Sequence, residues 1–247
     1  MTVIRHNENR LPRQRQRRFA TIGLGSLLVV AGVILTLQRD GRMCHRLLIV
    51  GAEYADSTAL AELARLDGAI DARLVADRIR RHPWIREAVG TCGKHGAVEV
   101  VVEERRPVLL VIASDGAPSH YVDAEGYRMP IAEHPNFDVP LLHGLEEAYH
   151  PVMQVKTEVV RQLAAAVGDL HDDADALISE FVITDSGVTL VTPVGGVEVL
   201  LGRDQLNDRF RSLVAFWQQA VVGSNDRTID MIDLRFDSQI ITVESDG

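Results

Sequence analysis

The feature that most constrains this sequence is an uncharged apolar run, residues 19–37, directly behind an arginine-rich tail. As an α-helix, these nineteen residues would extend about 28 Å, close to the thickness of the hydrocarbon core of a bilayer. A run of this length without a charge is typical of a membrane span rather than of a core helix. The sequence therefore predicts a single transmembrane helix over residues 19–37, with all later residues on one side of the membrane.

The flanking charges predict the orientation of this span. The tail, residues 1–18, carries six arginines and one glutamate, whereas residues 38–46 carry three arginines and one aspartate. Because basic residues favour the cytoplasmic side, we expect the N-terminus in the cytoplasm. The alternative is a cleaved signal peptide, but residues 38–42 contain no small-residue cleavage site. We therefore expect an uncleaved anchor in the cytoplasmic membrane, in contact with lipid, and an extracytoplasmic remainder.

Charge also limits the classes of partner. The chain has 26 basic and 35 acidic residues. The tail holds six of the basic residues and one of the acidic residues, so residues 19–247 hold 20 basic and 34 acidic residues. An acidic exterior argues against nucleic-acid binding, which depends on cationic contacts to phosphates. We expect no nucleic acid among the partners of this chain.

The first extracytoplasmic part has the pattern of a small β-α-α-β-β domain over residues 45–106. A β-rich run at residues 47–50 precedes two amphipathic helices, for which Asp56 and Asp71 are candidate N-caps. Strands are expected at residues 85–89 and 98–104, joined by a turn-rich loop at residues 90–96. The run of charges at residues 103–106 is interpreted as a solvated domain junction.

Residues 107–247 have the pattern of a larger α+β domain, mostly antiparallel sheet with flanking helices. Helices are expected at residues 152–167 and 206–221. Strands are expected at residues 108–113, 121–123, 181–184, 188–192, 197–201, 229–234 and 239–244.

Five segments of this chain form a recognisable series. They are residues 82–89 with 98–107, the hairpin at residues 122–127 with its Asp-x-x-Gly pattern, the Val-Pro-Leu-Leu-His-Gly stretch at residues 139–144, residues 199–203, and residues 232–238 with the sequence Asp-Leu-Arg-Phe. In their order and spacing these segments resemble the FtsQ/DivIB family of bacterial cell-division proteins. The resemblance implies that residues 45–106 are a POTRA-like domain and residues 107–247 the family's β domain. The hairpin at residues 90–96 departs from the family pattern, so a contact made there by relatives does not carry over.

The resemblance also implies a function. It implies a non-enzymatic scaffold of the divisome at the division septum, which binds small coiled-coil, single-span division proteins similar to FtsB and FtsL. Residues 239–243 alone predict an apolar, β-branched strand at or near a sheet edge, where a partner strand could add. Carried over by position, the partner-binding residues are Arg235, Phe236, Asp237, Ser238 and Ile240.

The sequence carries no recognised motif for catalysis or metal binding. The sequence has no G-x-S-x-G, H-E-x-x-H, P-loop or dinucleotide-binding glycine pattern. His134, His143 and His150 match no recognised ligand spacing and are interpreted as loop histidines. We therefore expect no cofactor, no metal and no small-molecule substrate. Two alternatives remain open from the residues, an accessory protein of export or transport and an anchored exported hydrolase.

The chain has two cysteines, Cys44 and Cys92. An oxidising compartment would permit a bridge between them, but two cysteines do not make a disulfide scaffold. The sequence leaves both the bridged and the free state open.

Overall fold

The computed structural model describes residues 46–65, 71–93, 96–131, 137–170, 177–192, 196–221, 228–237 and 239–245. The predicted membrane span lies outside these residues, as do Cys44, His134 and Ser238. Within the described ranges, no helix has the length and hydropathy needed to cross a membrane.

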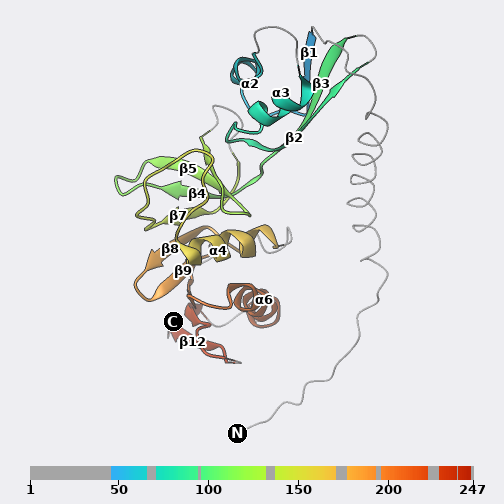
Figure 1. The fold of residues 1–247 in the computed structure, drawn as a ribbon. Helices are drawn as coiled ribbons and strands as arrows, with labels where there is room; N and C mark the ends of the chain where they lie inside the picture. Colours follow the sequence, from blue (N-terminus) through green and yellow to red (C-terminus); the bar gives the residue numbers. More distant parts are fainter. Residues whose placement is uncertain are drawn as a thin grey trace, which may run out of the picture.

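The first described part is a three-stranded sheet with two helices, in the predicted order β-α-α-β-β. The elements are β1 (Arg46–Val50), α2 (Ser57–Leu63), α3 (Ala72–Ile79), β2 (Ile85–Cys92) and β3 (Ala97–Glu104). The strand order is β1-β3-β2, with β1 parallel and β2 antiparallel to β3. Figure 1 shows this sheet at one end of the molecule.

The predicted helix caps are confirmed. The Asp56 carboxylate accepts a hydrogen bond from Thr58 N at 2.9 Å, and the Asp71 carboxylate accepts one from Arg73 N at 2.8 Å. Each bond satisfies a backbone donor that the first turn of a helix leaves unpaired.

The second part is a nine-stranded sheet with two helices. Its elements are β4 (Pro107–Ile112), β5 (Pro118–Asp123), β6 (Arg128–Pro130), β7 (Leu141–His143), α4 (Glu158–Gly168), β8 (Glu180–Thr184), β9 (Gly187–Val191), β10 (Glu198–Gly202), α6 (Leu206–Phe216), the π-helical η1 (Trp217–Val221), β11 (Thr228–Asp233) and β12 (Ile241–Ser245). The strand order is β12-β11-β10-β9-β8-β7-β4-β5-β6. The fold is therefore mixed α+β and dominated by one large sheet, as predicted.

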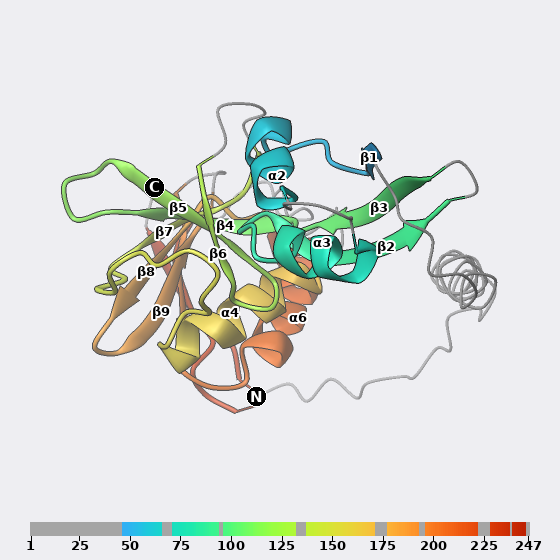
Figure 2. The ribbon, with the colours of Figure 1, turned by 45° about the horizontal axis from the view of Figure 1, so that its top comes forward.

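This sheet is more mixed in direction than the sequence predicts. Five of its strand pairs are antiparallel, but β4–β7, β7–β8 and β10–β11 are parallel. Helices α4 and α6 lie side by side against one face of the sheet (Figure 2). The core between these helices and the sheet is apolar. It includes Phe181 of β8 and Phe210 of α6, whose rings meet edge to face with centroids 5.9 Å apart.

Several predicted boundaries are wrong. The helix predicted to begin at residue 152 begins at Glu158, because Val152 has a φ of 61° and Gln154 forms a β-bridge with Tyr127. The helix predicted over residues 206–221 changes to a π-helix at Trp217. Residues 90–92 continue β2 rather than belonging to a loop. The short strands β6 and β7 were not predicted.

The two sheets meet at an aromatic cluster around Trp84, which is 2% exposed. The Trp84 ring stacks on Phe137 at 5.5 Å and meets Tyr121 of β5 at 6.0 Å. The sequence predicts Glu104 and Arg105 in a solvated junction, but both make internal bonds. The Glu104 carboxylate accepts backbone N–H groups of residues 53–55, and Arg105 forms a 2.7 Å ion pair with Asp123. The junction is therefore packed and bonded.

Candidate partner-binding site

The C-terminal strand β12 is the last strand at one end of the nine-stranded sheet. It pairs antiparallel with β11, and no other described strand lies on its far side. Figure 1 shows this hairpin at the end of the molecule away from the three-stranded sheet. A strand in this position presents backbone N–H and C=O groups to a partner.

Apolar side chains are exposed along this hairpin. Phe236 is 51% exposed at the bend between the two strands, and Ile240 is exposed beside the start of β12. On β12, Ile241 and Val243 are exposed, and Val243 is 45% accessible. Because alternate residues of a strand share a face, Ile241 and Val243 lie on the same side of β12. The edge thus combines open main-chain groups with apolar side chains, the two contributions that strand addition uses.

The bend is held by an ion pair between Asp233 and Arg235. Arg235 donates to the Asp233 carboxylate from its backbone N at 3.0 Å, from Nε at 2.9 Å and from Nη2 at 2.6 Å. The hydrogen bonds from Arg235 hold the pKa of the Asp233 carboxyl below its ordinary value, so this carboxylate is ionised at neutral pH. Arg235 was predicted as a contact for a partner, and the structure places its guanidinium on Asp233.

The sequence did not single out Arg209, which comes from α6 and supports the same bend. Arg209 donates to the carbonyl oxygens of Leu201 and Arg235. Gly202 leaves room for the Arg209 side chain. Its φ of 74° favours glycine, and a Cβ added at this position would stand 2.5 Å from Arg209 Nη1. The available signal in the sequence was a glycine at the end of a strand, followed by an arginine in a helix. The spacing of these two residues does not show that they are in contact.

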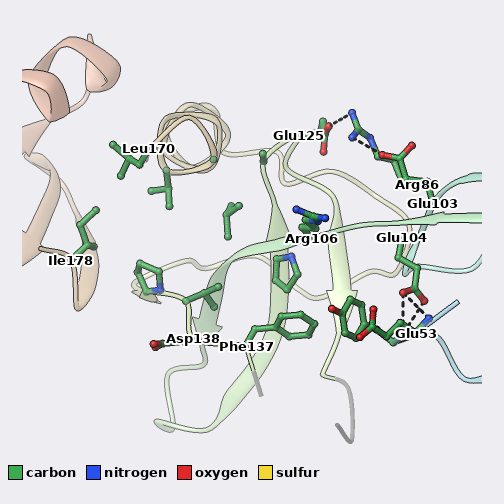
Figure 3. A pocket seen from close by; sticks show the side chains of 18 of the residues that line it. Glu53, Arg86, Glu103, Glu104, Arg106, Glu125, Phe137, Asp138, Leu170 and Ile178 are labelled. Atoms are coloured by element: carbon green, nitrogen blue, oxygen red, sulfur yellow. Dashed lines mark hydrogen bonds and ion pairs between the residues drawn. The ribbon is translucent and has the colours of Figure 1, made fainter. Parts of the chain in front are cut away.

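A second candidate is a groove of about 1520 Å³ between the two sheets (Figure 3). One end is apolar, with Leu170 and Ile178, and the other end is charged. At the charged end, Arg86 bridges Glu103 at 3.2 Å and Glu125 at 2.8 Å. These charges are used within the chain, so the groove offers fewer unused groups than the β12 hairpin.

The histidine-rich neighbourhood does not form a metal site among the described residues. His143 lies on β7 rather than in a loop, with Nε2 3.4 Å from a Glu180 carboxylate oxygen. The Nδ1 atom of His150 lies 2.8 Å from the Pro151 carbonyl oxygen. Glu147 is bonded to Arg128 at 2.7 Å and accepts the Thr157 N–H at 2.6 Å. Of the two cysteines whose state the sequence leaves open, Cys92 is disulfide-bonded, and Cys44 lies outside the described residues.

Comparisons with known proteins identify the family. Residues 106–243 match the model of the family described as FtsQ/DivIB, C-terminal related. A cell division protein FtsQ from Rhodothermus marinus is 41% identical over 242 residues, covering 94% of this chain and 88% of the relative. The chain belongs to the FtsQ/DivIB family. The FtsQ of Salinibacter ruber is 36% identical over 242 residues, covering 88% of this chain and 91% of the relative. The FtsQ of Neisseria meningitidis is 24% identical over 242 residues, covering 95% of this chain and 96% of the relative.

The family match bears on the candidate site. It includes the bend and the first residues of β12, and so contains Arg235, Phe236, Asp237 and Ile240. Of these, Phe236, Asp237 and Ile240 are exposed at one end of the sheet, whereas Arg235 is paired internally. Membership in the FtsQ/DivIB family supports a role for this chain in bacterial cell division.

Proposed function

We propose that this FtsQ/DivIB-family chain is a non-enzymatic, single-span scaffold of the divisome. In this proposal the N-terminus is cytoplasmic, residues 19–37 cross the cytoplasmic membrane, and a POTRA-like domain and a β domain act outside the cytoplasm at the septum. The chain captures small coiled-coil, single-span division proteins, of the FtsB and FtsL kind, by β-strand addition to β12.

The observation that carries this proposal is the open edge of β12 with its apolar side chains. A partner strand paired with β12 would gain main-chain hydrogen bonds, while Ile241 and Val243 would contact alternate side chains of that strand. Phe236 would serve as the aromatic anchor at the bend. Arg235 and Arg209 support Phe236 indirectly, because their bonds fix the backbone on which it stands.

Family membership adds to the geometric argument. The relatives carry the name of a cell division protein, and two of them match this chain over most of its length at more than 30% identity. No observation on the described residues favours the export or hydrolase alternative.

The proposal is tested by Phe236→Lys in tagged, full-length protein purified from membranes. Loss of a central aromatic anchor typically costs at least about 2 kcal/mol of binding energy, or roughly thirty-fold in affinity. We therefore expect the small coiled-coil partners to disappear from the co-purified complex. Because Phe236 is half exposed, the unfolding transition of the chain should not change.

The matched control is Leu74→Lys, on the exposed side of α3, where Leu74 is accessible to a similar degree. This variant should keep the partners. Retention of the partners by a folded Phe236→Lys protein would show that the edge is not their binding site.

A further inference from the structure

The two sheets end in four edge strands, and the chain protects two of them. The edge at β6 ends in Pro130 and is covered by the segment after Met153, because Arg128 N donates to the Met153 carbonyl at 3.3 Å. The edge at β2 carries Arg86 and Glu87 and has a bulge at this point. Prolines, charges, bulges and covering segments are the usual means of blocking an edge. Among the described residues, no segment covers the edges of β12 and β1, and these two are called the unprotected edges below.

Strand β1 has the composition of a central strand although it lies at an edge. Its sequence, Arg-Leu-Leu-Ile-Val, is apolar on both faces after its first residue. Leu47 and Ile49 pack against the core of the small sheet but are only partly buried. On the other face, Leu48 is 54% exposed and Val50 is exposed beside it. Strands that are apolar on both faces are typically buried on both faces, so the exposed side chains of β1 are expected to gain a covering neighbour.

The outer face of the small sheet argues against lipid as this neighbour. Leu48 lies opposite Glu99 in the register of β1 and β3, and Glu87 and Glu103 stand opposite one another on β2 and β3. Anionic lipid headgroups attract basic residues and would repel Glu87 and Glu99, whereas Glu103 is paired with Arg86. The apolar strip of β1 therefore fits a protein strand better than a membrane surface.

The position of β1 in the chain points to a second copy of the same protein. The eight residues between the predicted span and β1 reach at most about 28 Å, so every copy holds its β1 within that distance of the bilayer. Two copies in one membrane are related by rotation about the membrane normal. A twofold rotation of this kind can place two β1 strands side by side and antiparallel.

We propose that two copies pair through β1 to form a continuous six-stranded sheet, with Leu48 on the twofold axis. All five residues of β1 then find partners, Leu48 against Leu48 of the second copy and Leu47 against its Ile49. Leu47, Leu48 and Ile49 thereby gain apolar partners, and Val50 stands opposite Arg46 of the second copy. The proposal rests on the anchor included in the proposed function, but not on partner capture by β12.

The test is disulfide trapping of the full-length protein in native membranes, with two differently tagged copies expressed together. In an antiparallel pair, two facing residues on the twofold axis lie about 5 Å apart, within the range of a disulfide. Leu48→Cys should therefore give, on oxidation, a reducible dimer that carries both tags. The matched control is Val101→Cys, which is exposed on the same face of β3. Its two copies would stand about 14 Å apart across three strand spacings and farther apart again along the strands, because Val101 lies opposite Val50 rather than Leu48, so this variant should give no dimer.

Three results would overturn the proposal: no dimer from Leu48→Cys, equal dimer from both variants, or a cross-link to a different protein.

A second variant is independent of the chosen register. Leu48→Lys combined with Val50→Lys should abolish co-purification of the two tags while the protein stays folded, and retained co-purification would contradict the proposal. Leu48→Cys is also combined with Phe236→Lys, which removes the proposed partner contact. Dimer trapping should persist in that protein, so failure of one proposal is distinguished from failure of the other.

Discussion

Arg235 lies at the bend that precedes β12. The family resemblance implies a direct contact with a partner for this residue, and that contact stays a prediction. In the structure Arg235 is paired with Asp233, two residues earlier, and its side chain is 40% exposed. Residues two apart on an extended strand lie on the same face, so this pairing was available from the sequence. The contact with Arg209 was not, because it depends on the packing of α6 over the end of β10.

His120 carries the clearest dependence on pH at the scale of single residues. It is 1% exposed, its Nδ1 lies 2.9 Å from Ser119 Oγ, and its Nε2 has no hydrogen-bond partner among the described residues. Burial, assisted by the positive charge of Arg128, lowers the pKa of His120 from 6.5 to about 4. The folded protein thus keeps this ring neutral at pH values where the unfolded chain takes up a proton.

Stability should therefore fall as pH drops from 6.5 towards 4. The loss from this group is about 3 kcal/mol of unfolding free energy, since each pH unit between the two pKa values contributes about 1.4 kcal/mol. His120→Phe keeps a ring beside Tyr149 but cannot titrate, and should be less sensitive to acid by that amount. Urea unfolding at pH 7, 5.5 and 4 measures the difference. If the unmutated protein and His120→Phe lose the same unfolding free energy between pH 7 and pH 4, His120 takes up its proton in the folded state and the prediction is wrong.

At the scale of elements, the start of a helix or strand could be predicted from the sequence where the residues that fix it lie in the same segment. The starts of α2 and α3 were predicted because Asp56 and Asp71 cap them from within the same segment. The start of α4 was not, because Thr157 makes no side-chain capping bond and the backbone just before the helix is held by Glu147, ten residues before Thr157. The three-residue strands β6 and β7 are too short to show a period of two. Their place follows from the neighbouring strands.

The junction between β2 and α3 depends on a glycine that the sequence assigned to a loop. A Cβ on Gly90 would stand 2.0 Å from the Ala72 carbonyl oxygen, which belongs to the backbone of α3 and cannot rotate away. Gly90→Ala should therefore push α3 off the sheet and destabilise the protein by roughly 1–3 kcal/mol. Thermal unfolding followed by the fluorescence of the two buried tryptophans, Trp84 and Trp217, measures the loss.

Gly93→Ala is the control, because a Cβ there would meet its nearest atom, the Ala97 carbonyl oxygen, at an ordinary 3.5 Å. An unfolding temperature for Gly90→Ala equal to that of Gly93→Ala would mean that α3 does not approach β2 as closely as described.

At the scale of the whole molecule, the two unprotected edges lie at opposite ends (Figure 1). The edge at β1 is close in sequence to the predicted anchor, and the edge at β12 lies about two hundred residues farther along the chain. The small sheet and the large sheet are joined by the Trp84 cluster and the Arg105–Asp123 pair, so the two edges are held by one packed structure. The strand order could not be predicted from the sequence, because three parallel pairs bring together strands that are not joined by hairpins.

The central claim is that β12 receives a partner strand, and site-specific photo-crosslinking in dividing cells tests it most directly. A photo-reactive amino acid replaces Val243 on β12 or, as a control, the similarly exposed Met153 beside β6 at the other end of the same sheet. The account predicts crosslinks from position 243 to small single-span, coiled-coil membrane proteins and none of these from position 153. Crosslinks to such proteins from position 153 alone, or from neither position in folded protein, would contradict it.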